Sequence, residues 1–181
     1  MDFDILYAIQ NLRCGFLDTL MVLLTNIVGS YGYLWIAVAA VLCIFKKTRR
    51  TGITVLVSYI LVFLVGQFVL KDLIARVRPC IIDQSVELLV SRPTSYSCPS
   101  THTAWSFGAA TAIFLYHKRA GIAAFVLAAI IGFSRLYLFV HFPTDVLAGV
   151  VLGIAAGFGA YYLVRFVSGK ISEKKHAGKA A

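Results

Sequence analysis

The segment SRLYLFVHFPTD, residues 134–145, carries an arginine, a histidine and an aspartate in an otherwise apolar part of the chain. Charged side chains are costly in such surroundings and are therefore functional candidates. Because the residue before a proline avoids the α region, we expect His141 to lie in a loop ahead of a helix with Pro143 in its first turn. Asp145 can then reach one ring nitrogen of His141 and leave the other unprotonated, as a carboxylate does for a nucleophilic or basic histidine.

Two cations lie in the sequence KDLIARVRP. Lys71 and Arg78 are seven residues apart, nearly two helical turns, so we expect both to project from one helix face and clamp an anion. Asp72 and Arg76 stand four apart on another face and are expected to pair with each other. Pro79 is expected to end the helix. Taken singly, each cation has an alternative interpretation as a long side chain that reaches the membrane interface.

The sequence PSTH predicts the start of a helix, with Ser100 as its N-cap. The first amides of that helix, including those of Thr101 and His102, have no partner within the helix and form an anion site at the positive end of the helix dipole. His102 would stand in the first turn, where it can give or take a proton beside a bound anion. The alternative is a capping serine beside an ordinary interfacial histidine.

Together these groups suit phosphoryl transfer, because its transition state spreads negative charge over three oxygens. His141 would attack phosphorus, and His102 would protonate the leaving oxygen. Water would then cleave the phosphohistidine. The equatorial oxygens would be held by the helix amides and by the three cations Lys71, Arg78 and Arg135. We expect no metal ion and no cofactor, since Asp145 is the one carboxylate committed to the site and the chain has no HExxH motif or cysteine cluster.

The elements that position these residues are predicted to span a membrane. The chain is 60% hydrophobic and 14% charged, which leaves too few charges to cover a soluble domain. Long stretches without charge match the roughly 20 residues that cross a bilayer as helix. We predict an all-α integral membrane protein with five transmembrane helices, at 18–45, 51–71, 100–116, 121–138 and 146–167. A bend at residues 29–32 would split the first span and give six.

The first residues, MDFDILYAIQNLR, are expected to form an interfacial helix, because apolar side chains recur at helical spacing. They lack the basic start of a signal peptide. The alternative is a frayed terminus. The predicted organisation is an interfacial helix at 1–15, one transmembrane domain at 16–168 and a basic cytoplasmic tail at 169–181.

Basic residues set the predicted orientation. With five spans, eleven of them fall on one side, which the positive-inside rule makes the cytoplasm. They are Lys46, Lys47, Arg49, Arg50, Lys118, Arg119, Arg165, Lys170, Lys174, Lys175 and Lys179. The candidate site then lies on the extracytoplasmic face of the cell membrane. The net charge of +9 reflects this topology and gives no indication of a nucleic-acid partner.

The three segments resemble the signature of the type 2 phosphatidic acid phosphatase superfamily, which shares its site with bacterial acid phosphatases and vanadium haloperoxidases. The family pattern is Lys-x6-Arg-Pro, Pro-Ser-Gly-His and Ser-Arg-x5-His-x3-Asp, and the order and spacing match over about residues 50–165. Thr101 stands where glycine is usual, which bears on substrate preference. The resemblance implies a helical core like that of these enzymes and a metal-independent lipid phosphatase.

Among small bacterial members of the family, the chain looks most like the bacitracin-resistance type, which implies hydrolysis of undecaprenyl pyrophosphate to undecaprenyl phosphate. Phosphatidylglycerophosphate and phosphatidic acid are the alternative substrates. A non-catalytic lipid-phosphate binder or transporter is the alternative function, but it would have no use for an oriented His141–Asp145 pair. The expected partners are a lipid phosphate and the bilayer, and the oligomeric state is left open.

Several features keep two interpretations. Cys80 and Cys98 flank the motifs and would form a disulfide only if their Cα atoms come within reach. The loop at residues 83–97 would cover the site, and Arg92 within it would contact a second phosphate or remain solvated. Gly149, Gly153, Gly157 and Gly159 form a small-residue face for packing within the chain or between copies. Thr25, Asn26 and Gln67 are expected to bridge helices rather than bind a ligand.

Overall fold

The computed structural model describes residues 2–180, with side chains to residue 170, and all regular structure in this part of the chain is helical. The predicted all-α class is thereby confirmed. The elements are α1 (Asp2–Gln10), α2 (Gly15–Val28), α3 (Tyr33–Ile44), α4 (Arg49–Val62), the π-helical η1 (Phe63–Leu70), α5 (Lys71–Ile74), α6 (Pro79–Ile82), α7 (Thr101–Tyr116), α8 (Lys118–Tyr137) and α9 (Pro143–Ala180). Residues 2–10 are therefore helical rather than frayed.

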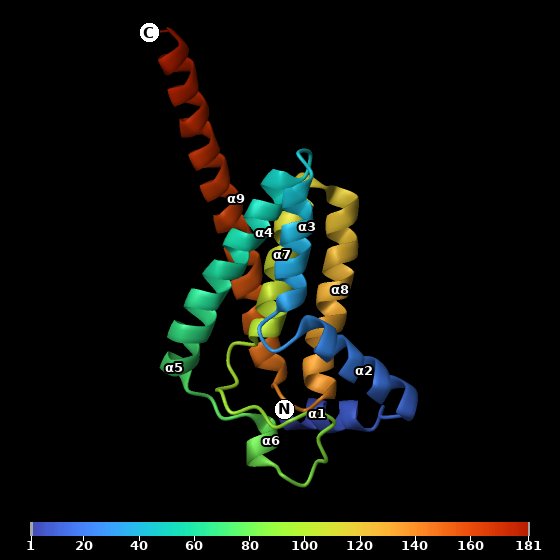
Figure 1. Cartoon of the computed structure of the whole chain (residues 1–181). Helices are drawn as coiled ribbons and strands as arrows, with labels where there is room; N and C mark the ends of the chain where they lie inside the picture. Colours follow the sequence, from blue (N-terminus) through green and yellow to red (C-terminus); the bar gives the residue numbers. More distant parts are fainter. Residues whose placement is uncertain (1, 181) are drawn as a thin grey trace.

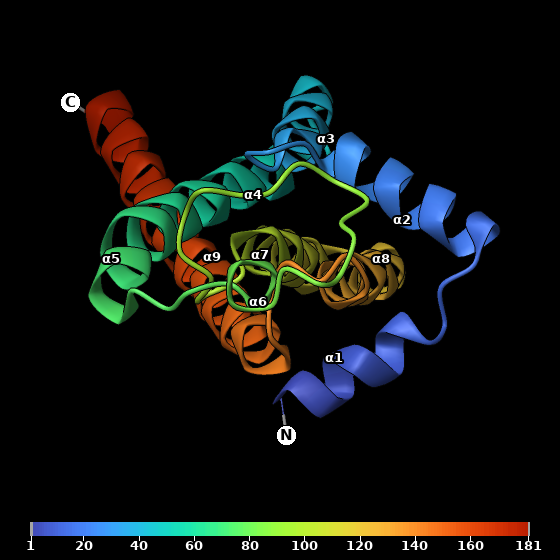
Figure 2. The ribbon, with the colours of Figure 1, turned by 90° about the horizontal axis from the view of Figure 1, so that it is seen from below.

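Helix α7 is the centre of the bundle, and α4, α8 and α9 pack against it (Figures 1 and 2). Three glycines let the α9 backbone approach α7 closely. A Cβ at Gly149 would lie 2.6 Å from the carbonyl oxygen of Ser100, and one at Gly153 would lie 2.4 Å from that of Ala104. A Cβ at Gly157 would likewise collide with α7, whereas one at Gly159 would only come near Leu61 of α4. The small-residue face is thus used for packing within the chain.

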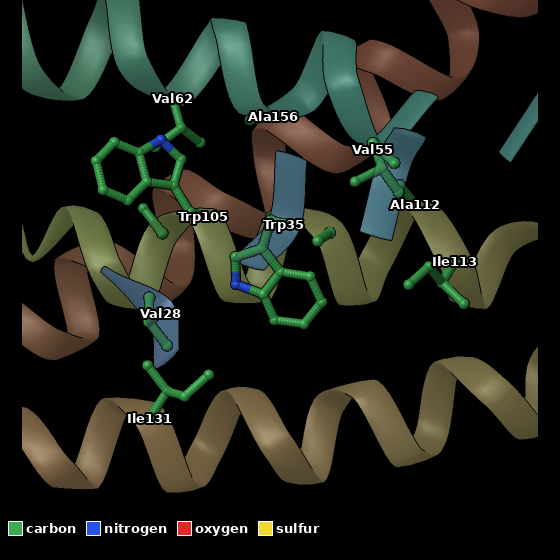
Figure 3. Packing of buried hydrophobic residues seen from close by; sticks show 12 residues of the cluster. Val28, Trp35, Val55, Val62, Trp105, Ala112, Ile113, Ile131 and Ala156 are labelled. Atoms are coloured by element: carbon green, nitrogen blue, oxygen red, sulfur yellow. The ribbon is translucent and has the colours of Figure 1, made fainter. Parts of the chain in front are cut away.

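The apolar core at the middle of the bundle is built around two tryptophans (Figure 3). Trp105 of α7 stacks on Tyr59 of α4, with ring centroids 5.3 Å apart. Trp35 of α3 donates its indole N–H to Ser106 at 2.9 Å. These contacts fix α3, α4 and α7 relative to one another, just behind the end of α7 that carries the PSTH motif.

Three segments are long and apolar enough to cross a membrane: Arg49–Ile82, Lys118–Tyr137 and Pro143–Lys170. The helices α1 and α2, bent by 118° at their junction, would count as a fourth. Many large apolar side chains face outward, as a lipid environment requires; they include Ile44, Leu147, Val151 and Phe166. The chain is therefore a membrane protein of the predicted class, although α3 and α7, with 12 and 16 residues, are shorter than a full span.

The first predicted span, 18–45, is two separate helices. Gly29 and Gly32 have φ values of 71° and 70°, which a side-chain-bearing residue rarely adopts. The chain turns there, so that α2 lies across one end of the bundle while α3 runs alongside α4 (Figures 1 and 2). The split that the sequence indicated at residues 29–32 therefore occurs, and it carries the carbonyl of Gly29 toward α7.

A second break in the helix contradicts the prediction that Lys71 and Arg78 of the first motif project from one helix face. The helix that begins at Arg49 ends at Ile74, because Ala75 takes a left-handed conformation with φ 47°. Arg78 is extended, with φ −75° and ψ 151°, and Pro79 begins the short helix α6 rather than ending a long one. Lys71 and Arg78 therefore do not share a helix face.

We expect Gly32→Ala to lower the free energy of unfolding by about 2 kcal/mol. The new methyl would meet Cε3 of Trp105 at 2.8 Å, and the left-handed backbone adds strain. Thermal unfolding in detergent measures the effect. Gly15→Ala is the matched control, because a Cβ at Gly15 has no neighbour within 4 Å. Equal stabilities for the two variants would contradict the role of Gly32.

Candidate active site

The three sequence motifs meet at the end of the bundle where α1 and α6 lie (Figure 2). A cavity of about 580 Å³ opens there. Its walls include six of the eight predicted site residues: Lys71, Arg78, Thr101, His102, Arg135 and His141. Ser100 and Asp145 lie behind the wall with no exposed surface.

Arg78 is held by the loop that follows α6. Its Nε donates to the carbonyl of Ser95 at 2.7 Å, and its Nη2 donates to the hydroxyl of Ser95 at 3.1 Å and to the carbonyl of Tyr96 at 3.2 Å. Lys71 donates to the same hydroxyl at 3.2 Å. Lys71 and Arg78 thus meet at Ser95, although the two cations come from different segments.

The tautomer of His141 follows from its contact with Arg78. Nη1 of Arg78 lies 3.1 Å from Nε2 of His141, and a guanidinium has only donors, so Nε2 accepts with its lone pair and Nδ1 carries the proton. Burial lowers the pKa of His141 to about 3, which keeps the imidazole neutral near pH 7. The nitrogen beside Arg78 is therefore unprotonated and can act as a nucleophile once Arg78 turns away.

Asp145 lies on the other side of His141, but the contact is not the simple one that the spacing predicts. Its Oδ2 is 3.7 Å from Nδ1 of His141, beyond hydrogen-bond range. Ser97 fills the gap: its hydroxyl donates to Oδ2 at 2.5 Å and lies 3.4 Å from Nδ1 of His141. The amide of Phe142 donates to Oδ2 at 2.9 Å. His141 is therefore oriented by a serine and a carboxylate together.

The predicted Asp72–Arg76 pair is wrong. Arg76 instead donates to Oδ1 of Asp145 at 2.7 Å and to Asp2 at 2.8 Å. The turn at Ala75 takes Arg76 out of the helix on which a four-residue spacing would have brought it beside Asp72.

His102 lines the cavity opposite the first motif. Its Nε2 lies 3.0 Å from the carbonyl of Gly29, so Nε2 donates and the turn between α2 and α3 holds the ring. Nδ1 of His102 makes no hydrogen bond to any residue in the described part of the chain. Arg135 donates to the hydroxyls of Ser134 and Thr25. His102 and Arg135 are thus held in place by α2 or by the turn that follows it. Neither of these two segments is part of the sequence motifs.

Ser100 occupies the N-cap position of α7 but makes no capping hydrogen bond with its side chain. Its hydroxyl lies 2.9 Å from that of Thr103, and its amide donates to the carbonyl of Asp145 at 3.0 Å. The amides of Thr101 and His102 have no partner among the described residues. Ser100 therefore ties α7 to α9, and the two following amides remain available for an anion.

The sequence alone does not identify Ser95 or Ser97 as site residues. The one feature that could have suggested them is that they stand just before the second motif. The preceding loop does border the cavity, through Val90, Arg92 and their neighbours. Thr25, Asn26 and Gln67 also line it, so the expectation that they only bridge helices is incomplete. Cys80 and Cys98 are buried free thiols.

The positive charge of the cavity comes from side chains. Among the described residues, no three His, Cys, Asp or Glu side chains gather as metal ligands would. Lys71, Arg78 and Arg135 instead surround one space together with the free amides of α7. This arrangement suits a tetrahedral oxyanion such as phosphate.

A model of the PAP2 superfamily matches residues 51–168 of the chain. The chain is 40% identical over 140 residues to an undecaprenyl-diphosphatase of Sulfolobus acidocaldarius, an alignment that covers 76% of this chain and 66% of that protein. It is 31% identical over 134 residues to the bacitracin transport permease protein BcrC of Bacillus licheniformis, with 72% and 66% covered. The chain thus spans just under two thirds of the length of these relatives.

The fold is similar to the crystal structure of a transmembrane PAP2-type phosphatidylglycerolphosphate phosphatase from Bacillus subtilis. The TM-score is 0.70 at 30% sequence identity, over 94% of this chain and 85% of that one. The similarity therefore extends beyond the motifs to nearly the whole described bundle.

We expect Arg78→Ala to weaken the binding of inorganic phosphate by at least about tenfold, because charge-assisted hydrogen bonds of the clamp are lost. Calorimetric titration of the detergent-purified protein measures the dissociation constant. Arg165→Ala, at the far end of the bundle, is the charge-matched control. The same dissociation constant in both variants would argue against an anion site at Arg78.

Proposed function

This chain belongs to the PAP2 superfamily, and from that premise we propose that it is a metal-independent lipid phosphatase that works through a phosphohistidine at His141. One observation carries the proposal: Arg78 donates to Nε2 of His141 while Ser97 and the buried Asp145 hold the opposite side of the ring. A site that only binds phosphate needs cations and amides. It does not need a histidine ring such as that of His141, which hydrogen-bonding partners on both sides hold in one orientation with Nε2 unprotonated.

In the first step, the phosphoryl oxygens lie among Lys71, Arg78, Arg135 and the amides of Thr101 and His102. Nε2 of His141 attacks phosphorus, and the bond from phosphorus to the leaving oxygen breaks. Before this attack Arg78 must turn its Nη1 from Nε2 to a phosphoryl oxygen, because the lone pair that accepts its hydrogen bond is the one that forms the P–N bond. Its fork of donors allows this exchange without a loss of hydrogen bonds.

His102 supplies the proton that the leaving oxygen takes up. For this step the ring enters as the imidazolium, so that Nδ1 carries the transferable proton while Nε2 keeps its hydrogen bond to the carbonyl of Gly29. In the second step, water attacks phosphorus, the P–N bond breaks and its electron pair returns to Nε2 of His141. The proton released by the water returns to His102. The enzyme is thereby restored, and inorganic phosphate leaves the cavity.

The proposed substrate is undecaprenyl pyrophosphate, which would yield undecaprenyl phosphate and phosphate. The undecaprenyl-diphosphatase that is 40% identical supports this choice. The alternatives are phosphatidylglycerophosphate, supported by the similar crystal structure, and phosphatidic acid. Thr101, in the position where the family pattern has glycine, borders the cavity and is one residue that would separate these substrates by size.

The proposed location is the cytoplasmic membrane, with the site on the extracytoplasmic face. The basic loop at residues 46–50 and the turn at residues 117–119 lie at the end of the bundle opposite the cavity, as the positive-inside rule requires (Figure 1). Helix α1 would lie at the membrane interface, and residues 16–168 would form one transmembrane domain. The proposed cytoplasmic tail, 169–181, falls largely outside the residues whose side chains are described.

We expect the purified protein to release phosphate in excess EDTA, with undecaprenyl pyrophosphate as the best of the three lipid substrates. His141→Ala should abolish release, because the nucleophile is gone. Phosphate release in detergent micelles measures both. His117→Ala, at the opposite end of the bundle, is the control and should retain activity. No release from any substrate by folded protein would indicate a lipid-phosphate binder or transporter instead.

We expect Asp145→Asn to lower kcat about 10³-fold with the fold retained, because an amide no longer stabilises the proton on Nδ1 of His141. Steady-state kinetics gives kcat, and thermal unfolding checks the fold. A kcat close to that of the wild type would show that Asp145 does not orient His141.

A further inference from the structure

Arg76 lies between two carboxylates and occupies a variable position of the first motif, Lys-x6-Arg-Pro. Its Nη1 donates to Oδ1 of Asp145 at 2.7 Å, and its Nη2 donates to Oδ2 of Asp2 at 2.8 Å. Asp145 has no exposed surface, whereas Arg76 and Asp2 are about 31% and 24% exposed. The guanidinium therefore connects a buried carboxylate to one at the surface, in the first turn of α1.

Each oxygen of Asp145 has a different set of partners. Oδ2 accepts from Ser97 and from the amide of Phe142, and it is the oxygen nearer His141. Oδ1 accepts from Nη1 of Arg76. A buried carboxylate without a counter-charge is strongly disfavoured, and Arg76 supplies a positive charge in direct contact with Oδ1 of Asp145. Arg76 therefore shares with Ser97 and the amide of Phe142 in fixing the rotation of the carboxylate, and hence the place of Oδ2.

Helix α1 fixes Arg76 in turn. Thr144 donates to the same oxygen of Asp2 at 2.9 Å and accepts from Nη1 of Arg76 at 2.6 Å. The guanidinium also lies 4.1 Å from the ring centroid of Phe142, and this ring packs edge-to-face with Phe3 of α1, with 5.1 Å between the two centroids. These contacts place the first turn of α1 directly behind the His141–Asp145 pair.

The remaining contacts of α1 show that it is packed rather than loosely attached. Leu6 is fully buried in a cluster with Cys80, Phe139 and Phe142. Gln10 donates to the carbonyl of Tyr137 at 3.0 Å. Tyr7 donates to Asp83 at 2.7 Å, a contact that ties α1 to the loop after α6 and does not touch Asp145.

We propose that Arg76 and Asp2 are positioning residues for His141, so that the docking of α1 sets the orientation of the Asp145 carboxylate and thereby the rate of phosphoryl transfer. The proposal rests on the proposed function, because it assigns a rate effect to that same site. Neither Arg76 nor Asp2 lines the cavity, so their removal should lower kcat and leave KM nearly unchanged.

Steady-state phosphate release from undecaprenyl pyrophosphate tests the proposal. We expect Arg76→Ala to lower kcat by about 10- to 100-fold, the range seen for outer partners of metal-bound histidines, and Arg76→Lys to restore part of the loss. Asp2→Asn should lower kcat by about fivefold, since it weakens a partly exposed ion pair. The double variant should be no slower than Arg76→Ala alone, because Asp2 acts through Arg76.

Tyr7→Phe is the matched control, because it removes an α1 hydrogen bond of similar length that leads away from the site. It should keep the kcat of the wild type, and thermal unfolding should show that all variants remain folded. A kcat for Arg76→Ala within twofold of the wild type would overturn the proposal. Equal losses in Tyr7→Phe and Asp2→Asn would also overturn it, since α1 would then act only as a structural anchor.

A second measurement does not depend on turnover. Histidine-selective ¹⁵N NMR reports the tautomer of His141, one of four histidines in the chain, and His141→Gln assigns its signals. We expect a proton held on Nδ1 in the wild type, in Tyr7→Phe and in Arg76→Ala, because Arg78 donates to Nε2 in all three, and a changed Nδ1 chemical shift in Arg76→Ala alone, because Oδ2 of Asp145 moves relative to that nitrogen. Unchanged signals in Arg76→Ala would reject the positioning role. A changed signal in Arg76→Ala alone, together with a wild type that releases no phosphate, would refute the proposed function and leave the positioning role supported.

Discussion

The buried carboxylate of Asp145 imposes a condition on everything around it. With no exposed surface, it needs protein donors on both oxygens, because an unsatisfied buried charge is prohibitively costly. Those donors come from the loop before α7, the segment after α5 and the residue just before α9. One charge thus holds together three segments that are far apart in sequence, and the nucleophile beside it is oriented as a consequence.

Breaks in the helices are what bring these segments together. The left-handed residue Ala75 ends the helix that starts at Arg49, which frees Arg76 and Arg78 to turn toward α9 and the loop at residues 95–97. The turn at Gly29 and Gly32 similarly releases α2 from α3 and directs a backbone carbonyl at His102. Uninterrupted spans would have kept these groups on separate helices. The site therefore depends on irregular backbone that is buried within the protein or lines a cavity.

Behind the site, close packing supplies rigidity. The α9 backbone lies against α7 through Gly149 and Gly153, and Ser100 bonds directly to the carbonyl of Asp145. The first turn of α7 and the first turn of α9 are thereby held in one register. Because the free amides belong to α7 and His141 and Asp145 belong to the loop and first turn of α9, this register sets the distance between the anion site and the nucleophile.

The sequence by itself determined the helical membrane class, the family and the residues that gather at the cavity, because hydrophobic run length and motif spacing are local properties of the chain. It also indicated the bend at residues 29–32, since paired glycines mark a turn. Only the tertiary structure decided that Arg76 pairs with Asp145 instead of Asp72, that Ser97 bridges Asp145 to His141, and that Gly29 holds His102. Each of these contacts joins residues at least 44 positions apart. Such contacts depend on the directions that the chain takes after the helices pack and after the left-handed turn. The spacing of residues along the sequence does not specify these directions.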